Sequence, residues 1–73
     1  MMTIEIRDDF IKLGQLLKLS GFAQSGLEAK IFIHDGRVKL NDEVVFERGK
    51  KVVPGDKISF DDNEIRVEKK DDH

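Results

Sequence analysis

The sequence predicts a small α+β domain in which a helical hairpin or corner packs on a short, largely antiparallel β-sheet. Two observations support this prediction. Apolar residues recur at helical spacing between Leu13 and Ile33, whereas beyond Gly36 apolar and polar residues alternate as in strands. The turn-forming pairs Asn41-Asp42 and Pro54-Gly55 then divide the second half of the chain into short segments.

Composition limits how such a domain can be stabilised. The chain has 73 residues and no cysteine, and we find no internal repeat or linker, so we expect one domain without disulfides. Its core must come from aliphatic residues and five phenylalanines. Apolar runs are far shorter than the roughly 20 residues of a membrane-spanning helix, and the N-terminus lacks the features of a secretory signal. We therefore expect a cytoplasmic protein that does not engage membranes.

The first half of the chain contains a strand and a first helix. Residues 3–6 (TIEI) alternate in polarity and predict a short strand. The helix begins at Phe10 or at Leu13, with Asp9 as the N-cap in the first case, and ends before Gly21. A short connector leads to a second helix that shares a core with the first. That core is predicted to contain Leu13, Leu17, Phe22, Ala29 and Ile33.

The second helix has a defined start and a defined end. Ser25 can cap its N-terminus, and Glu28 can reach back to the Ser25 N–H to complete a capping box. Gly36 suits the left-handed position that ends many helices. Apolar residues fall on more than one face, which predicts that the helix is buried on most sides. The remaining face would carry Lys30, His34 and Arg37, which recur at i, i+4 and i+7.

The second half of the chain predicts short strands joined by tight turns. Both residues of Asn41-Asp42 tolerate the positive φ of a two-residue hairpin turn, and Pro54-Gly55 fits a type II turn. The charged residues 69–73 form a tail that we expect to be disordered. Four short strands are expected, at residues 37–40, 43–46, 57–60 and 64–68, with Val52 and Val53 leading into the Pro54-Gly55 turn.

Charge is distributed unevenly along the chain. The net charge is −2 at pH 7, yet residues 12–51 hold eight Lys/Arg against five Asp/Glu. Residues 1–11 hold one against three, and residues 52–73 hold four against seven. Positive charge is therefore concentrated in the middle of the chain, where a local patch can attract an anionic partner despite the negative total.

These signals form an ordered set that spans residues 12–60. Its members are Lys12-Leu13, Leu17, Gly21, Ser25, Ala29, Phe32-Ile33, Gly36, Val38, Asn41, Val52 or Val53, Gly55-Asp56 and Ile58. Their order and spacing resemble the S4 RNA-binding domain, a module of a small-subunit ribosomal protein, pseudouridine synthases and tyrosyl-tRNA synthetases. The resemblance implies an alpha-L fold, with residues 1–68 forming a single S4-like domain.

Three positions depart from the family's pattern. Gly26 stands where the family has an arginine after the serine, Gly14 where it has an aspartate, and Asp42 where it has the turn glycine. The missing arginine removes a phosphate contact. The Ser25-Gly26 pair and the LLKL run at 16–19 are similar to the stand-alone bacterial S4-like proteins. That similarity implies binding of structured RNA such as ribosomal RNA, in connection with ribosomes.

The resemblance and the basic pattern together give a set of candidate RNA-binding residues. Lys and Arg would neutralise phosphates and release counterions. The lack of Tyr and Trp argues against stacking on single-stranded bases, so structured RNA recognised by shape is the expected partner. The candidates are Lys12, Ser25, Lys30, His34, Arg37, Lys39, Asn41, Lys50 and Lys51.

Several of these residues also have an ordinary structural explanation. Lys30 and Arg37 could pair with neighbouring carboxylates on a solvated helix face. Ser25 suits a helix cap, and His34 suits a cation near a helix C-terminus. The lysines of the 47–51 loop could act only in solubility. The resemblance favours RNA binding over these explanations for Lys30 and Arg37.

Catalytic and metal-binding functions find no support in the sequence. Two histidines and no cysteine give no zinc-binding set. No nucleophile arrangement accompanies His34, and no glycine-rich loop is present to hold a phosphate-bearing cofactor. We expect a monomeric binding module, not an enzyme, without cofactor, metal or small-molecule substrate.

Two other functions stay open at this point. The chain could be a protein-interaction or adaptor domain that docks a partner through its acidic strands or through the edge at Val44, Val45 and Phe46. It could also be a separate specificity domain that acts beside an RNA enzyme.

Overall fold

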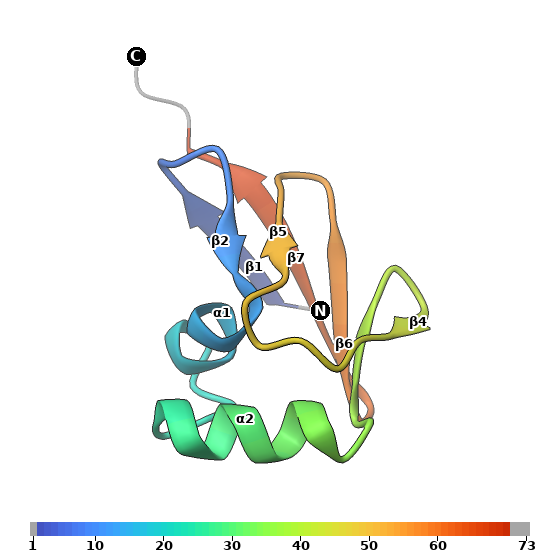
Figure 1. Ribbon diagram of the computed structural model, residues 1–73. Coiled ribbons are helices and arrows are strands. Elements are labelled where there is room, and N and C mark those ends of the chain that lie inside the picture. The colour runs from blue at the N-terminus through green and yellow to red at the C-terminus, as the bar shows by residue number, and fades with distance from the viewer. Residues whose placement is uncertain (1, 71–73) are drawn as a thin grey trace.

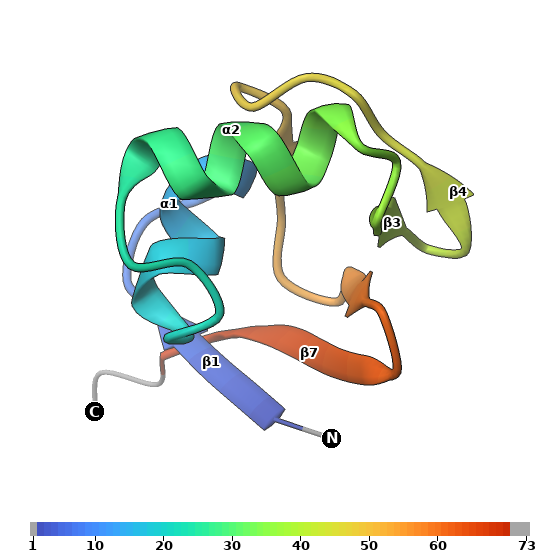
Figure 2. The same ribbon diagram turned by 90° about the horizontal axis from the view of Figure 1, so that it is seen from below.

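The structure, a computed structural model, describes residues 2–70. Both helices lie on the same side of the strands, as Figures 1 and 2 show from two directions. In chain order the elements are β1 (Met2–Ile6), β2 (Ile11–Lys12), α1 (Leu13–Leu19), α2 (Gly26–His34), β3 (Val38–Leu40), β4 (Glu43–Val44), β5 (Lys51–Val52), β6 (Lys57–Phe60) and β7 (Asn63–Lys69).

The described strands form a sheet in the order β1-β7-β6-β3-β4 and a separate ladder of β2 with β5. β1 pairs with β7 in parallel, whereas the other pairs are antiparallel. This arrangement confirms the predicted α+β class and its largely antiparallel sheet. The parallel pair joins the first and last strands of the chain, which no local signal could indicate.

Both predicted turns are confirmed. Asn41 and Asp42 have φ of 51° and 73° between the paired residues Leu40 and Glu43, as a two-residue hairpin turn requires. At the second turn Gly55 has φ of 98°, and the Asp56 N–H donates to the Val53 carbonyl at 3.0 Å. The strand predicted at 43–46 is shorter than expected, because β4 ends at Val44.

Helix α1 begins at Leu13, so the alternative start at Phe10 with Asp9 as the cap is wrong. Lys12 occupies the N-cap position, and its side chain makes no capping hydrogen bond. Instead, the Leu13 N–H donates to the Lys50 carbonyl at 2.8 Å, and the Gly14 N–H donates to the Arg48 carbonyl at 3.0 Å. These carbonyls satisfy two of the free N–H groups at the helix start and fix the 48–50 loop against it.

The core lies between the helices and one face of the sheet. Of the predicted core residues, Leu13, Leu17, Ala29 and Ile33 are fully buried. Phe22 is half-buried and stacks on Phe60, with ring centroids 5.5 Å apart. The other fully buried large side chains are Leu16, Val38, Val52, Ile58, Ile65 and Val67.

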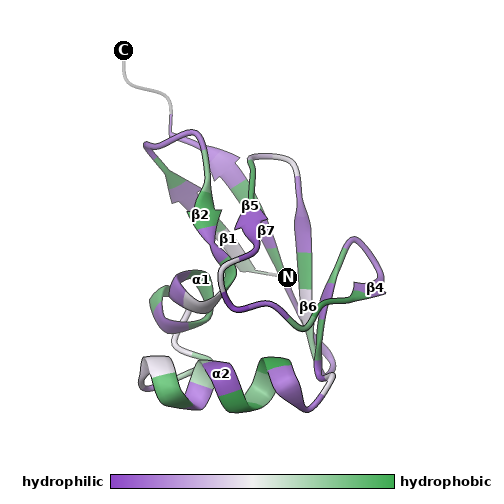
Figure 3. Cartoon of the chain, in the orientation of Figure 1, coloured by the Kyte–Doolittle hydropathy of each residue, from purple (hydrophilic) through white to green (hydrophobic). Residues whose placement is uncertain are grey.

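The prediction that α2 is buried on most sides is wrong. Leu27 is 66% exposed and Ile31 is 49% exposed, whereas the buried residues of the helix are Ala29 and Ile33. The reason is that one side of α2 faces α1 and the core, and nothing in the described chain covers the other. Figure 3 shows hydrophobic residues in green alternating with hydrophilic residues in purple along the visible length of α2.

The C-terminal strand extends further than predicted. β7 continues to Lys69, and the Lys70 N–H donates to the Ile6 carbonyl at 2.7 Å. The Lys69 ammonium also lies 3.1 Å from the Asp9 carboxylate. These two residues of the predicted tail are thus held on the sheet, and the rest of that tail, 71–73, lies outside the described residues.

Candidate nucleic-acid interface

Ser25 starts α2 by capping it, as predicted. Its hydroxyl accepts from the Glu28 N–H at 3.1 Å. The reciprocal bond differs from the prediction, because the Glu28 carboxylate accepts from the Gln24 N–H at 3.0 Å and not from Ser25. One lone pair of the Ser25 hydroxyl is thus committed to holding the helix start in place.

Arg37 does not lie on the face of α2 that carries Lys30 and His34. Gly36 turns the chain with φ of 75°, and its N–H donates to the Ile33 carbonyl at 3.1 Å. The Arg37 N–H donates to the Phe32 carbonyl at 3.3 Å, which completes a Schellman motif. The predicted i, i+4, i+7 alignment is therefore wrong, because the helix ends before its third member.

The Arg37 guanidinium is bound within the fold. It donates to both carboxylate oxygens of Asp61, at 2.6 Å and 3.1 Å. It also lies over the rings of Phe32 and Phe60, with its central carbon 4.7 Å and 4.9 Å from their centroids. The hydrogen bonds raise the pKa of Arg37 and lower the pKa of Asp61. The Arg37 cation is therefore already paired with a carboxylate of the same chain.

Asn41 joins the two predicted turns. Its amide nitrogen donates to the Asp56 carboxylate at 3.0 Å, and its amide oxygen accepts from the Lys57 N–H at 3.0 Å. The other Asp56 carboxylate oxygen accepts from the Val53 N–H at 3.0 Å. Asn41 and Asp56, which belong to the same family pattern, thus form one structural connection.

Lys39 lies on a different surface from Lys30. Side chains alternate along a strand, and Val38 next to it is fully buried. Lys39 therefore points away from the core and the helices. It stands opposite Ser59 on β6 and Val44 on β4.

Other cations do come together, around a hollow of about 360 Å³ between the starts of α1 and α2. We call it the basic hollow, and no acidic residue lines it. Among the described residues, ion pairs engage Arg37, Lys57 and Lys69, but none of the cations that line this hollow. The lining residues are Lys12, Gly14, Gln15, Lys18, Gly26, Arg48 and Gly49.

The positive surface continues on both sides of the basic hollow. Lys51 stands directly opposite Lys12 in the ladder of β2 with β5, and its ammonium lies 4.7 Å from the Phe10 ring centroid. Lys30 lies one turn beyond Gly26 along α2, and His34 lies one turn further; both are exposed. Lys50, by contrast, lines a separate hollow with residues 44–47.

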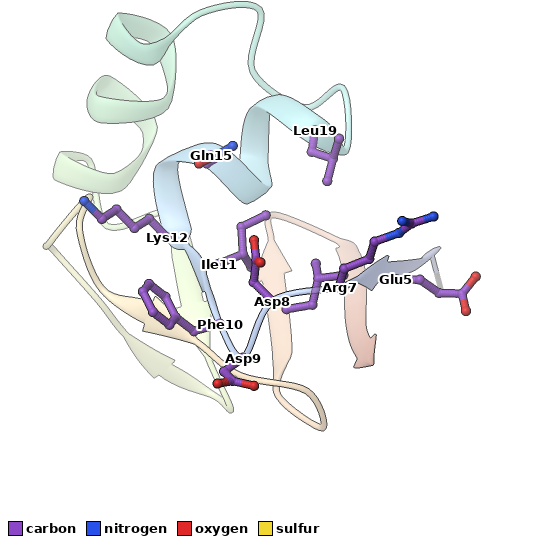
Figure 4. A pocket seen from close by; sticks show the side chains of 10 residues that line it. Glu5, Arg7, Asp8, Asp9, Phe10, Ile11, Lys12, Gln15 and Leu19 are labelled. Carbon is purple, nitrogen blue, oxygen red and sulfur yellow. The ribbon is translucent and has the colours of Figure 1, made fainter. Parts of the chain in front are cut away.

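A larger hollow of about 650 Å³ lies on the other side of Lys12, and Figure 4 shows it from close by. Glu5, Asp8 and Asp9 line it together with Arg7 and Lys12. Its charges have both signs, so it offers no concentrated potential to a polyanion.

Lys18 and Arg48 were not among the RNA-binding residues predicted from the sequence. A signal for Lys18 was present, because Lys12, Gln15 and Lys18 recur every three residues on the polar side of α1. Arg48 had no such signal. Its position follows from the bond of its own carbonyl to the Gly14 N–H, a contact between segments far apart in the chain.

Two findings bear on metals and membranes. Within residues 2–70, we find no group of three or more His, Cys, Asp or Glu side chains arranged to hold a metal ion. Neither described helix is long and apolar enough to cross a membrane.

Two helices against a mixed sheet, with tight turns tied by Asn41, define a small module of the alpha-L type. Residues 4–68 match the family model of the S4 domain. The chain therefore belongs to the S4 domain family, which confirms the resemblance found in the sequence.

Relatives and solved structures agree with this family. The chain is 39% identical over 57 residues to YbcJ of Escherichia coli (strain K12), which is named as a candidate RNA-binding protein. That alignment covers 78% of this chain and 81% of YbcJ. It is 41% identical over 58 residues to RlbA of Bacillus subtilis (strain 168), which is named as a candidate ribosome maturation protein. That alignment covers 80% of this chain and 82% of RlbA.

Among solved structures, the solution structure of YbcJ from E. coli matches with a TM-score of 0.72 and 35% identity. The match covers 93% of this chain and 87% of that one, and the structure is described as having an alpha-L motif involved in RNA binding. A pseudouridylate synthase matches with a TM-score of 0.70 and 21% identity, over 77% of this chain and 24% of the synthase. That second likeness concerns the fold.

Proposed function

We propose that this chain is a non-catalytic module that binds structured RNA through the basic hollow and the exposed side of α2. The observation that carries the proposal is the convergence of Lys12, Lys18 and Arg48 on a hollow without acidic residues. Cations without a counterion among residues 2–70 are suited to neutralise phosphates and release the ions condensed on them.

The relatives support this function and narrow the partner. YbcJ is described with a motif involved in RNA binding, and RlbA is named for ribosome maturation. Ribosomal RNA is therefore the first RNA to test, and the module would act as a monomer in the cytoplasm. The chemistry is confined to binding, because the proposed surface presents cations and an amide but no arrangement of nucleophile and base.

The candidate residues divide into two roles in this proposal. Lys12, Lys30, His34 and Lys51 contact RNA, together with Lys18 and Arg48. Ser25, Arg37 and Asn41 position the surface, because their polar groups are engaged within the fold. The remaining candidates, Lys39 and Lys50, lie outside the basic hollow.

Binding measured against salt tests the function. Fluorescence anisotropy with folded ribosomal RNA fragments, single-stranded RNA and duplex DNA gives the affinity at several salt concentrations. Each neutralised phosphate should contribute roughly −0.7 to −0.9 to the log–log slope. We expect a steep slope and a preference for folded RNA. A flat slope, or no binding at low salt, would contradict the proposed function.

A charge reversal with a matched control locates the surface. Lys12→Glu with Lys30→Glu should lower RNA affinity at least about tenfold at low salt, because two phosphate contacts become repulsive. Lys39→Glu with Arg66→Glu makes the same change in net charge on exposed strand positions outside the basic hollow, and should have little effect. A larger loss in the control pair would place the RNA on the outer face of the sheet instead.

A protein-interaction function has one observation in its favour. Val44 and Phe46 are 42% and 59% exposed beside a hollow of about 270 Å³ at the edge of the sheet. If the salt titration shows no RNA binding, this edge is the next surface to test, and Phe46→Ser should then reduce binding of a protein partner.

A further inference from the structure

We propose that the basic hollow is a phosphate-binding site and that Arg48, held across Gly14, is the residue that compensates for the glycine at position 26. This inference deepens the proposed function and rests on it for the source of the phosphate, the RNA backbone. It assigns a role to two departures from the family pattern, Gly14 and Gly26.

The first step is the close approach of Arg48 to Gly14. A Cβ added at Gly14 would lie 2.5 Å from Arg48 Cγ and 3.1 Å from Arg48 Cδ. Any side chain at position 14 must therefore displace the Arg48 side chain. The Arg48 carbonyl would be 3.5 Å from that Cβ, so the backbone contact could remain.

The second step is that the backbone conformation at position 14 does not require glycine. It lies within α1, whereas the described glycines with positive φ are Gly21, Gly36 and Gly55. Glycine in a helix interior is less stable than alanine, because it loses more backbone freedom on folding. What the residue gains at this position is room for the Arg48 stem, which keeps that side chain at the hollow.

The third step concerns Gly26, which lines the same hollow from the start of α2. A Cβ added at Gly26 would meet no atom within 4 Å, so this part of the hollow is open. The family pattern places an arginine here, and its charge would enter the region that Arg48 now borders. In this chain the cation beside that opening therefore comes from the 48–49 loop and not from α2.

The residues that line the basic hollow indicate which ligand it can bind. The lining side chains are two lysines, one arginine and one glutamine, with glycines between them and no large apolar residue. A phosphate group fits such a site, because it offers several oxygens to cations and to an amide donor and needs no apolar contact. Inorganic pyrophosphate is a suitable probe that does not depend on any RNA.

The experiment uses the full chain and two substitutions that take the Arg48 charge away from the hollow by different routes. Gly14→Ala displaces the Arg48 side chain but leaves its charge in the protein. Lys39→Gln, at an exposed strand position outside the hollow, is the control for the loss of one positive charge. Arg48→Gln removes the charge and provides a second route to the same result. NMR spectra of the backbone amides report pyrophosphate binding, and anisotropy reports binding of folded RNA.

We expect pyrophosphate to shift the Gly26 and Gly49 amide signals in the unmodified chain and, equally, in Lys39→Gln. Gly14→Ala and Arg48→Gln should weaken pyrophosphate and RNA binding by roughly five- to tenfold, the loss of one charged contact. The thermal midpoint of Arg48→Gln should stay close to that of the unmodified chain, because the carbonyl at position 48 still accepts from the Gly14 N–H. Affinity would then fall without a loss of stability, which a general loss of structure cannot produce.

The outcomes separate the two proposals. If Gly14→Ala and Arg48→Gln both bind pyrophosphate and RNA as tightly as the unmodified chain, the inference is wrong even though the RNA-binding function stands. Pyrophosphate shifts that map away from the hollow would also overturn it. If pyrophosphate binds in the hollow but folded RNA does not bind, the phosphate site stands for a free phosphate ligand and the proposed function fails.

Discussion

Two groups of cations in this small domain differ in what surrounds them. Arg37 and Lys57 lie on or beside the sheet, where Asp61 and Asp42 are close enough to pair with them. Lys12, Lys18 and Arg48 lie along and beside α1, and no carboxylate lines their hollow. The first group holds turns and strands together, whereas the second is available to a partner.

The comparison shows that a basic residue must be judged by its counterions and not by its spacing along the chain. Arg37 matched the helical pattern of the predicted stripe, yet it pairs with Asp61, twenty-four positions later. Arg48 matched no pattern, yet it lines the same hollow as Lys12 and Lys18. Three experiments test this difference.

The largest effect on stability is expected from Asn41→Ala. The change removes two hydrogen bonds and places alanine at φ of 51°, which together should cost about 2 kcal/mol. For a domain of this size that corresponds to a fall of about 10 °C in the thermal midpoint. Calorimetry and urea unfolding measure it.

Asn41→Gly serves as the matched control for that prediction. Glycine also loses the side-chain bonds but accepts the positive φ, so it should be less destabilising than alanine. Equal losses for the two variants would show that backbone strain contributes nothing at this turn. Neither variant should weaken RNA binding once the folded fraction is taken into account.

Arg37→Ala should lower stability less than Asn41→Ala does. Lys18→Ala should show the reverse pattern from Arg37→Ala, with weaker RNA binding and unchanged stability. Arg37→Ala should lower the urea midpoint, because it removes the Asp61 pair and the contact with two phenylalanine rings. It should change RNA affinity less than about twofold, since that charge is already neutralised. Lys18→Ala should leave the urea midpoint in place and weaken RNA binding. The opposite pattern in both variants would contradict the division into two groups.

The smallest effect concerns acid pH. Because Arg37 lowers the pKa of Asp61 in the folded protein, the pair stabilises the fold above the usual pKa of the unfolded carboxyl. That contribution is lost as the pH falls through the lower folded-state pKa. Urea unfolding at a series of acid pH values should therefore show a shallower pH dependence in Arg37→Ala than in the unmodified chain. Identical dependence in both proteins would exclude a role for the pair.

Local signals in the sequence predicted much of the fold. Ser25, Gly36 and the two turns were found because each rests on the conformational preference of one or two residues. The resemblance to the S4 domain then predicted how these elements are combined, as an alpha-L fold.

What the sequence did not predict depends on contacts between distant segments. The ladder of β2 with β5 involves two residues on each strand, too few for a recognisable alternation. The exposure of Leu27 and Ile31 depends on what lies beside α2, which its own composition does not contain. The basic hollow could not be predicted either, because its cations come from a helix, a short strand and a loop that are brought together only by the fold.

The way in which α1 is capped has a consequence for how such a module can change over time. The helix start is closed by the carbonyls of Arg48 and Lys50, and every amino acid offers a carbonyl. Substitutions at positions 12, 48 and 50 therefore alter the charge of this region without uncapping the helix. Selection can adjust affinity for a partner at these positions while the stability of the domain stays nearly constant.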